Sequence, residues 1–120
     1  MTKADFERKR KTSSAYFETE IKKITAAIVK KYNPEKIILF GSLARSQPKP
    51  DSDIDLFIIK NTKEKFHHRI GDVLNIVDYD SPLEPLVYTP QELKKRISLG
   101  DFFIEEVLTT GKVLYDKTQH

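Results

Sequence analysis

The chain has 120 residues, 38% of them hydrophobic and 32% charged, which indicates one water-exposed globular domain with a single core. It contains no cysteine, which excludes disulfides and thiolate chemistry, and no apolar run approaches the ~20 residues that span a bilayer. The net charge of +3 suits polyanionic ligands without identifying one. We therefore expect a single domain over residues 1–120, without a secretory signal, in the cytoplasm and away from membranes.

The first third of the chain is expected to form one long helix. Apolar residues recur there at the helical spacing i, i+4, i+7, i+11 and i+15: Phe17, Ile21, Ile24, Ile28 and Tyr32. Asn33-Pro34 ends it, because proline disfavours helical geometry in the residue before it. Residues 1–12 are polar and basic, and we expect a frayed extension or a continuation of the helix. We interpret the run 8–11 as a solvated helix face rather than a nucleic-acid contact.

Two strands and a helix are expected next. Residues 36–40 form a short apolar, β-branched run that ends at Gly41, and residues 53–59 form a second such run. Ser42 opens a short turn between them, and Pro48 and Pro50 then impose a loop. Asn61 and Glu64 resemble a capping box for a helix whose apolar face comprises Phe66, Ile70, Val73, Leu74 and Val77.

The last part of the chain predicts a third strand, over residues 83–88, and two helices. Thr89-Pro90-Gln91-Glu92 combines an N-cap, a proline at the first helical position and an acidic residue at the third. That helix ends near Gly100, and a second one, containing Phe102-Phe103, stops at Gly111. Residues 113–115 add an edge strand or pack across the domain. This order predicts an α+β fold, a small mixed β-sheet with helices packed on one face.

Asp53 and Asp55 are the strongest chemical signal in the sequence. They are two residues apart, so they project from the same face of a strand whose following residues are apolar. With Cα atoms about 6–7 Å apart, two such anions repel by roughly 2–3 kcal/mol at an effective dielectric near 20. A divalent cation relieves this repulsion, and carboxylate oxygens suit Mg²⁺ or Mn²⁺.

Gly41 and Ser42 supply a candidate phosphate site. A glycine directly after a buried strand lets the backbone approach a phosphate, and Ser42 offers a hydroxyl and free amides at the start of a turn. If the two strands are antiparallel neighbours, the end of the first lies beside the start of the second. The phosphate cradle and the carboxylates would then face each other.

These residues resemble a known signature. Gly41-Ser42-Leu43-Ala44-Arg45 followed by Ser52-Asp53-Ile54-Asp55-Leu56 is similar to the motif of the DNA polymerase β-type nucleotidyltransferases, in particular the minimal nucleotidyltransferases. The resemblance implies a polymerase β-like nucleotidyltransferase fold and nucleotidyl transfer assisted by two Mg²⁺ ions. It implies that Asp53 and Asp55 bind the metal and that Ser42 contacts the β- and γ-phosphates of ATP.

The resemblance also implies a third carboxylate on a neighbouring strand, near the acceptor. Glu84 opens the third strand and is the candidate, although aspartate is commoner there and Pro85 follows it. Asp78 and Asp80 compete with it but lie in an expected turn. Arg45 either reaches a phosphate of the nucleotide or pairs with an acidic residue.

The resulting hypothesis is a Mg²⁺-dependent transfer of AMP from ATP to a hydroxyl group. Minimal members of the family often pair with a small helical protein of the HEPN type as toxin and antitoxin, so we expect such a partner, a homodimer, or both. One alternative is a nucleotide- or partner-binding module with weak catalysis that acts by masking. A further alternative is an RNA-binding domain that uses the basic N-terminal segment, although a nucleic-acid partner is not our expectation.

Overall fold

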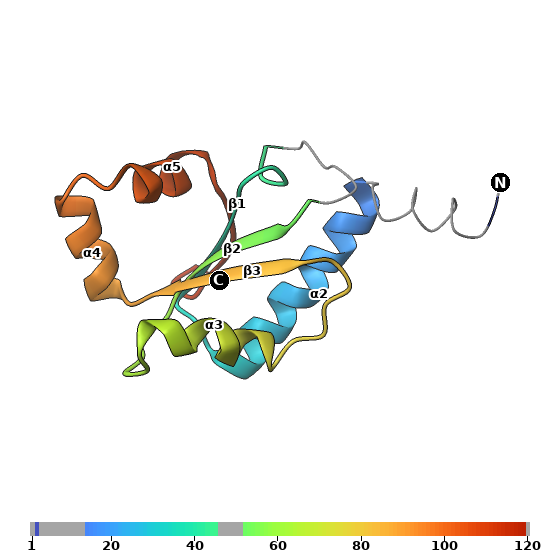
Figure 1. The fold of residues 1–120 in the computed structure, drawn as a ribbon, viewed down its shortest axis with the longest axis horizontal. Helices are drawn as coiled ribbons and strands as arrows, with labels where there is room; N and C mark the ends of the chain where they lie inside the picture. Colours follow the sequence, from blue (N-terminus) through green and yellow to red (C-terminus); the bar gives the residue numbers. More distant parts are fainter. Residues whose placement is uncertain (1, 3–13, 46–51, 120) are drawn as a thin grey trace.

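The computed structural model describes residue 2 and residues 14–45 and 52–119, and its centre is one four-stranded sheet (Figure 1). The strands are β1 (Lys36–Phe40), β2 (Ile54–Ile59), β3 (Leu83–Tyr88) and β4 (Lys112–Asp116), in the order β3-β2-β1-β4. β1 is antiparallel to β2 and to β4, whereas β2 and β3 are parallel. The predicted α+β class and mixed sheet are confirmed, and the C-terminal segment forms an edge strand.

Four helices flank the sheet within the described residues: α2 (Ser14–Tyr32), α3 (Phe66–Leu74), α4 (Pro90–Ser98) and α5 (Phe102–Thr110). α2 ends at the residue before Asn33-Pro34, as predicted, and Asn33 takes a positive φ of 52°. The expected extension over residues 1–12 and the basic run 8–11 lie, apart from Thr2, outside the described residues.

The helices cover both faces of the sheet, which corrects the prediction that they pack on one face. Core residues of α2 and α3, among them Ile24 and Val73, pack on one face, and Ile104 and Val107 of α5 pack on the other. In Figure 1, α3 and the C-terminal part of α2 lie below the strands, and α5 lies above them. The physical reason is that β2 is apolar on both sides and carries one half-buried residue, Asp55, so both faces need cover.

Of the two capping boxes predicted from the sequence, the structure contains one. At α4 the Thr89 hydroxyl accepts a hydrogen bond from the Glu92 amide (3.1 Å), and Glu92 accepts one from the Thr89 amide (2.8 Å), which confirms the capping box. The capping box expected at Asn61 and Glu64 is wrong. α3 starts after Lys65, without a side-chain cap. The Glu64 amide donates instead to the Thr62 hydroxyl at 3.1 Å, in the loop before the helix.

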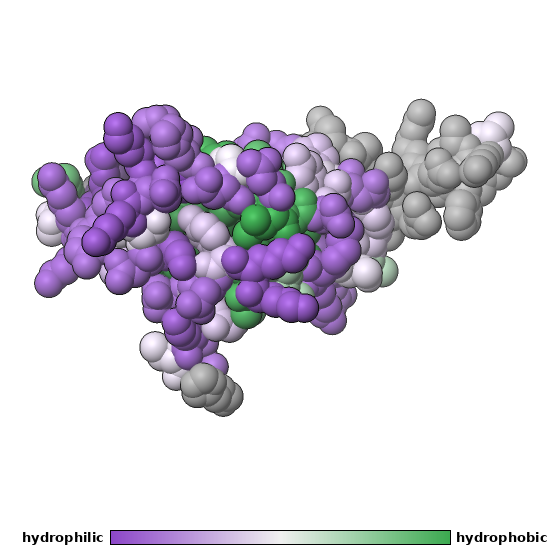
Figure 2. Space-filling model, turned by 90° about the horizontal axis from the view of Figure 1, so that it is seen from below, coloured by the Kyte–Doolittle hydropathy of each residue, from purple (hydrophilic) through white to green (hydrophobic). Residues whose placement is uncertain are grey.

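The face of the molecule seen from below in Figure 2 is mostly hydrophilic, with hydrophobic residues gathered near its centre. Among the described residues, no helix has both the length and the apolar character required to cross a bilayer.

Arg69 joins three elements on the α3 side, a role that no sequence pattern indicates. Its side chain is 6% exposed and donates to the carbonyls of Glu64 (2.9 Å) and Val87 (3.1 Å). It also forms two hydrogen bonds to the Glu92 carboxylate, at 2.6 and 3.3 Å. Those bonds are the largest cause of the lowered pKa of Glu92. Arg69 therefore ties α3 and β3 to the start of α4.

Arg69→Ala is expected to lower the free energy of unfolding by about 2–4 kcal/mol, because it removes a buried donor set and leaves a buried carbonyl unpaired. Arg96→Ala is the control, since Arg96 pairs with Asp101 at 3.9 Å while 54% exposed, and it should cost less than about 1 kcal/mol. Urea unfolding measures both. Equal losses for the two variants would contradict the role assigned to Arg69.

Candidate active site

Three carboxylates meet at one end of the sheet. Asp55 of β2 lies directly across from Glu84 of β3 in the parallel pair, and Asp53 precedes the first residue of β2. Each of the three offers a carboxylate oxygen within 4.8 Å of the others. Asp55 shares the α5-facing side of the sheet with Phe57, because the two residues are two apart in one strand. We call Asp53, Asp55 and Glu84 the carboxylate cluster.

Gly41 lies against this cluster. Its φ of +79° favours glycine, and a Cβ atom placed on it would overlap the Asp55 carboxylate oxygen Oδ2. Both the backbone conformation and the lack of a side chain are therefore required here. The predicted approach of the first strand's end to the start of the second is confirmed, because Phe40 pairs with Asp55 in the antiparallel register.

Ser42 is held next to the carboxylates through Ser52. Its hydroxyl donates to the Ser52 hydroxyl at 3.4 Å, and Ser52 is buried directly before Asp53. The Arg45 amide donates to the Ser42 carbonyl (3.2 Å), which closes the expected turn. Ser52 belongs to the signature Ser52-Asp53-Ile54-Asp55-Leu56, but the sequence gives it no role of its own in the site. We call Gly41–Arg45 the elbow.

Arg45 is exposed and brings a positive charge to the same region. Its charge lowers the pKa of Asp55, against the larger effects that raise it. With Gly41 and Phe103 it lines a cleft of about 190 Å³ next to the elbow.

Of the candidates for the third carboxylate, Glu84 is the one that the structure brings to the other two. Asp80 instead accepts a hydrogen bond from the Tyr16 hydroxyl (2.5 Å), and its amide donates to Glu20 (2.6 Å), so it ties the turn before β3 to α2. Pro85 is compatible with this position because β3 is an edge strand, where a missing amide donor is tolerated.

Asp55 carries the strongest electrostatic signal of the site. Burial raises its pKa to about 6, with further contributions from the charges of Glu84 and Asp53 and a hydrogen bond with Glu84. Above that pH the cluster concentrates negative charge that one exposed arginine only partly offsets. Three carboxylate oxygens so placed fit a hard divalent cation such as Mg²⁺ or Mn²⁺.

A cleft opens at the cluster. It has a volume of about 460 Å³ and is lined by Asp55 and Glu84 together with the apolar residues Phe40, Leu86 and Phe103, among others. Phe103 is 39% exposed and lines both clefts. No pattern in residues 102–110 indicates this position, because helix periodicity does not encode which side of the sheet α5 covers.

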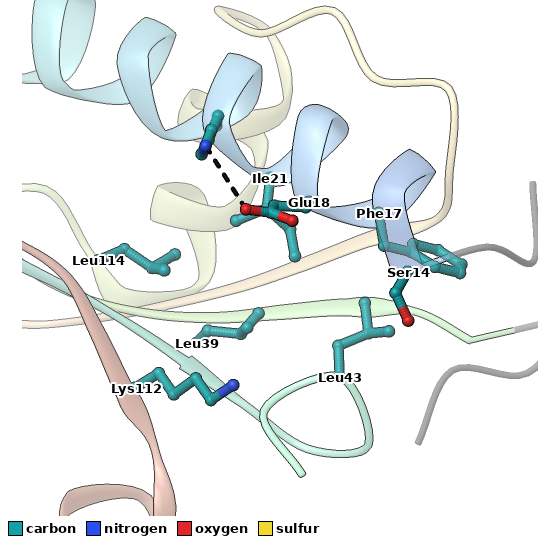
Figure 3. A pocket seen from close by; sticks show the side chains of 9 residues that line it. Ser14, Phe17, Glu18, Ile21, Leu39, Leu43, Lys112 and Leu114 are labelled. Carbon is teal, nitrogen blue, oxygen red and sulfur yellow. Dashed lines mark ion pairs between the residues drawn. The ribbon is translucent and has the colours of Figure 1, made fainter. Parts of the chain in front are cut away.

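A separate apolar groove of about 440 Å³ lies on the other face of the sheet (Figure 3). Phe17 and Ile21 of α2 face Leu39, Leu43 and Leu114 across it. Leu39 belongs to the core on the α2 side, opposite the face that carries Asp55. This groove is therefore distinct from the clefts at the carboxylates.

Gly41→Ala is expected to weaken divalent-metal binding and to destabilise the fold by more than Gly100→Ala. Both glycines have a positive φ, so both variants bear the same conformational cost of about 1–2 kcal/mol. A Cβ atom at Gly100 would meet open space, whereas one at Gly41 would meet Asp55. The difference between the variants reports displacement of Asp55. Metal titration and urea unfolding measure this difference. Equal losses of metal affinity and of stability in the two variants would refute the close approach of Gly41 to Asp55.

Asp55→Asn is expected to stabilise the metal-free protein at pH 8 by about 1–3 kcal/mol. The folded protein binds a proton at the Asp55 carboxylate more tightly than the unfolded chain does, since the pKa of Asp55 rises from 3.8 to about 6 on folding. Its charge therefore destabilises the fold fully above about pH 6 and progressively less down to about pH 4. Urea unfolding in EDTA at pH 8 and pH 4 tests this, and a wild-type protein more stable than the variant at pH 8 would contradict it.

Comparisons with known proteins identify the family of the chain. The family model "Polymerase beta, Nucleotidyltransferase" matches residues 22–120. A "putative protein adenylyltransferase" of Methanocaldococcus jannaschii is 32% identical over 100 residues, covering 82% of this chain and 97% of the relative. The crystal structure of a "putative nucleotidyltransferase" from Sulfolobus solfataricus has the same fold, with a TM-score of 0.56 and 21% identity over 89% of this chain and 91% of that one. The chain belongs to the polymerase β-type nucleotidyltransferase family, and its features are those of a minimal nucleotidyltransferase.

Proposed function

We propose that this protein transfers AMP from ATP to a hydroxyl group of a protein, with release of pyrophosphate. The observation that carries the proposal is the meeting of Asp53, Asp55 and Glu84 within 4.8 Å of one another, beside the glycine of the elbow. Membership of the nucleotidyltransferase family gives the reaction type. The identity of the nucleotide and of the acceptor is part of the proposal.

The carboxylate cluster would hold two divalent cations, in this proposal Mg²⁺, with Mn²⁺ as a substitute. Bound there, the cations would stabilise charge on the attacking and leaving oxygens of an in-line displacement. The protein then has to position the reactants and to offset their charge. Ser42 and the amides of the elbow would bind the β- and γ-phosphates, and Arg45 would add a positive charge beside them.

Glu84 is assigned to the acceptor side of the site. It is the exposed member of the cluster, on the edge strand β3, whereas Asp53 and Asp55 are half-buried. An incoming hydroxyl group therefore reaches Glu84 from solvent. In this position the carboxylate would orient the hydroxyl and favour loss of its proton.

The acceptor would be a hydroxyl-bearing side chain of another protein. The relative from Methanocaldococcus jannaschii, a "putative protein adenylyltransferase", supports this choice. We propose a small helical protein of the HEPN type as the acceptor, with this chain as antitoxin, or a second copy of this chain.

The second candidate function is a nucleotide- or partner-binding module with weak catalysis. It is favoured by Glu84, which is longer than the aspartate common in this family and is exposed. Such a module would bind Mg²⁺ and ATP without releasing pyrophosphate.

Transfer is tested with α-³²P-ATP, Mg²⁺ and candidate acceptor proteins. Label is expected to move to an acceptor protein, and Asp55→Asn is expected to lower the rate by at least about 100-fold, because it removes a cation ligand at the reacting phosphate. Asp78→Asn is the control: it alters an exposed carboxylate outside the cluster and should leave the rate unchanged.

Label transfer that Asp55→Asn leaves intact would refute the assigned site. Binding of ATP without transfer to any acceptor would favour the binding module instead. EDTA should abolish transfer by both the wild-type protein and the Asp78→Asn variant.

A further inference from the structure

We propose that Phe103, backed by Phe40, is the surface on which the base of the nucleotide stacks, and that this surface selects purines over pyrimidines. The inference rests on the proposed function, since it concerns the nucleotide of that same site. It assigns a specificity-determining role to a residue outside the motifs that the sequence reveals.

The sheet register places the aromatic pair beside the carboxylates. Phe40, Asp55 and Glu84 form one row across β1, β2 and β3, since Phe40 pairs with Asp55 and Asp55 pairs with Glu84. Phe103 of α5 packs edge-on against Phe40, with ring centroids 5.5 Å apart and planes at 85°. The aromatic pair is therefore one strand away from the proposed metal ligands.

The buried residues that attach α5 to the sheet are other than Phe103. Ile104 and Val107 attach α5 to the sheet and are at most 2% exposed, and Asp101 caps the helix through the amides of Phe103 and Ile104. Phe103 remains 39% exposed, against 85% for its neighbour Phe102. A half-covered ring held from one side by Phe40 presents apolar area to solvent, which a stacked base would cover.

The two clefts of the site share this aromatic pair. The cleft of about 460 Å³ contains Asp55 and Glu84, and the cleft of about 190 Å³ contains Gly41 and Arg45. A triphosphate that is bound at both the elbow and the carboxylate cluster therefore lies next to Phe40 and Phe103. Ribose tethers the base to the same phosphates, so the base lies within reach of the rings.

The remaining cleft residues suggest how the base is selected. Pro85, Leu86 and Val107 add apolar surface around the rings. Stacking depends on the area of the base, because every base presents a π-face. A purine covers more of Phe103 than a pyrimidine does, so ATP and GTP should bind more tightly than CTP and UTP.

The test compares binding of Mg·ATP and of Mg·tripolyphosphate, which lacks a base, by isothermal titration calorimetry. Phe103→Ala is expected to weaken ATP binding about 5- to 100-fold and to leave tripolyphosphate binding unchanged. Phe103→Tyr keeps the ring and should bind ATP like wild type. Phe103→Leu keeps apolar bulk without the ring and should bind like Phe103→Ala.

Phe102→Ala is the matched control, one residue away on the same helix turn, and should change neither affinity. Equal ATP affinity in Phe103→Ala and wild type would overturn the inference, as would an equal loss of ATP and tripolyphosphate binding or a wild-type preference for pyrimidines. A wild-type protein that binds neither Mg·ATP nor Mg·tripolyphosphate would instead refute the proposed function. The two failures are therefore distinguishable.

Discussion

Three carboxylates repel one another at the end of a small sheet, and the register of the strands holds them together. The rest of this structure is arranged around that repulsion. β-Sheet pairing fixes Asp55 against Glu84, and the start of β2 adds Asp53. Burial and the two neighbouring charges raise the pKa of Asp55 to about 6. Such an arrangement opposes folding at neutral pH unless a cation binds. Its presence is explained by function rather than by stability.

The surrounding elements keep that arrangement in place. Gly41 leaves room for the Asp55 carboxylate, and Ser42 is bonded to Ser52 beside Asp53. On the far side, the buried Arg69 fastens α3 and β3 to α4, which leads into α5. The helix that carries Phe103 is thus fixed relative to the strand that carries Glu84. One sheet and its two layers of helices thus position the carboxylate cluster, the elbow and the pair formed by Phe40 and Phe103.

The sequence was most informative where local chemistry decides the structure. The positions of the strands, to within one residue at each end, and the capping box at Thr89 follow from short-range patterns and are confirmed. The approach of Gly41 to Asp55 was predicted on the condition that the two strands are antiparallel neighbours, and it is also confirmed. Positions that depend on tertiary packing were not predictable. Arg69 lies on a helix face among apolar residues, and nothing local pairs it with Glu92, 23 residues away. The placing of α5 on the second face was missed because the helix pattern of residues 102–110 does not encode which side of the sheet it covers. Phe103 was missed for the same reason.

The most direct measurement is an anomalous difference map from crystals grown with Mn²⁺ and a non-hydrolysable ATP analogue. The account predicts manganese peaks bounded by Asp53, Asp55 and Glu84, with the β- and γ-phosphates on Ser42. Manganese bound elsewhere, or a nucleotide whose phosphates lie away from the elbow, would contradict it.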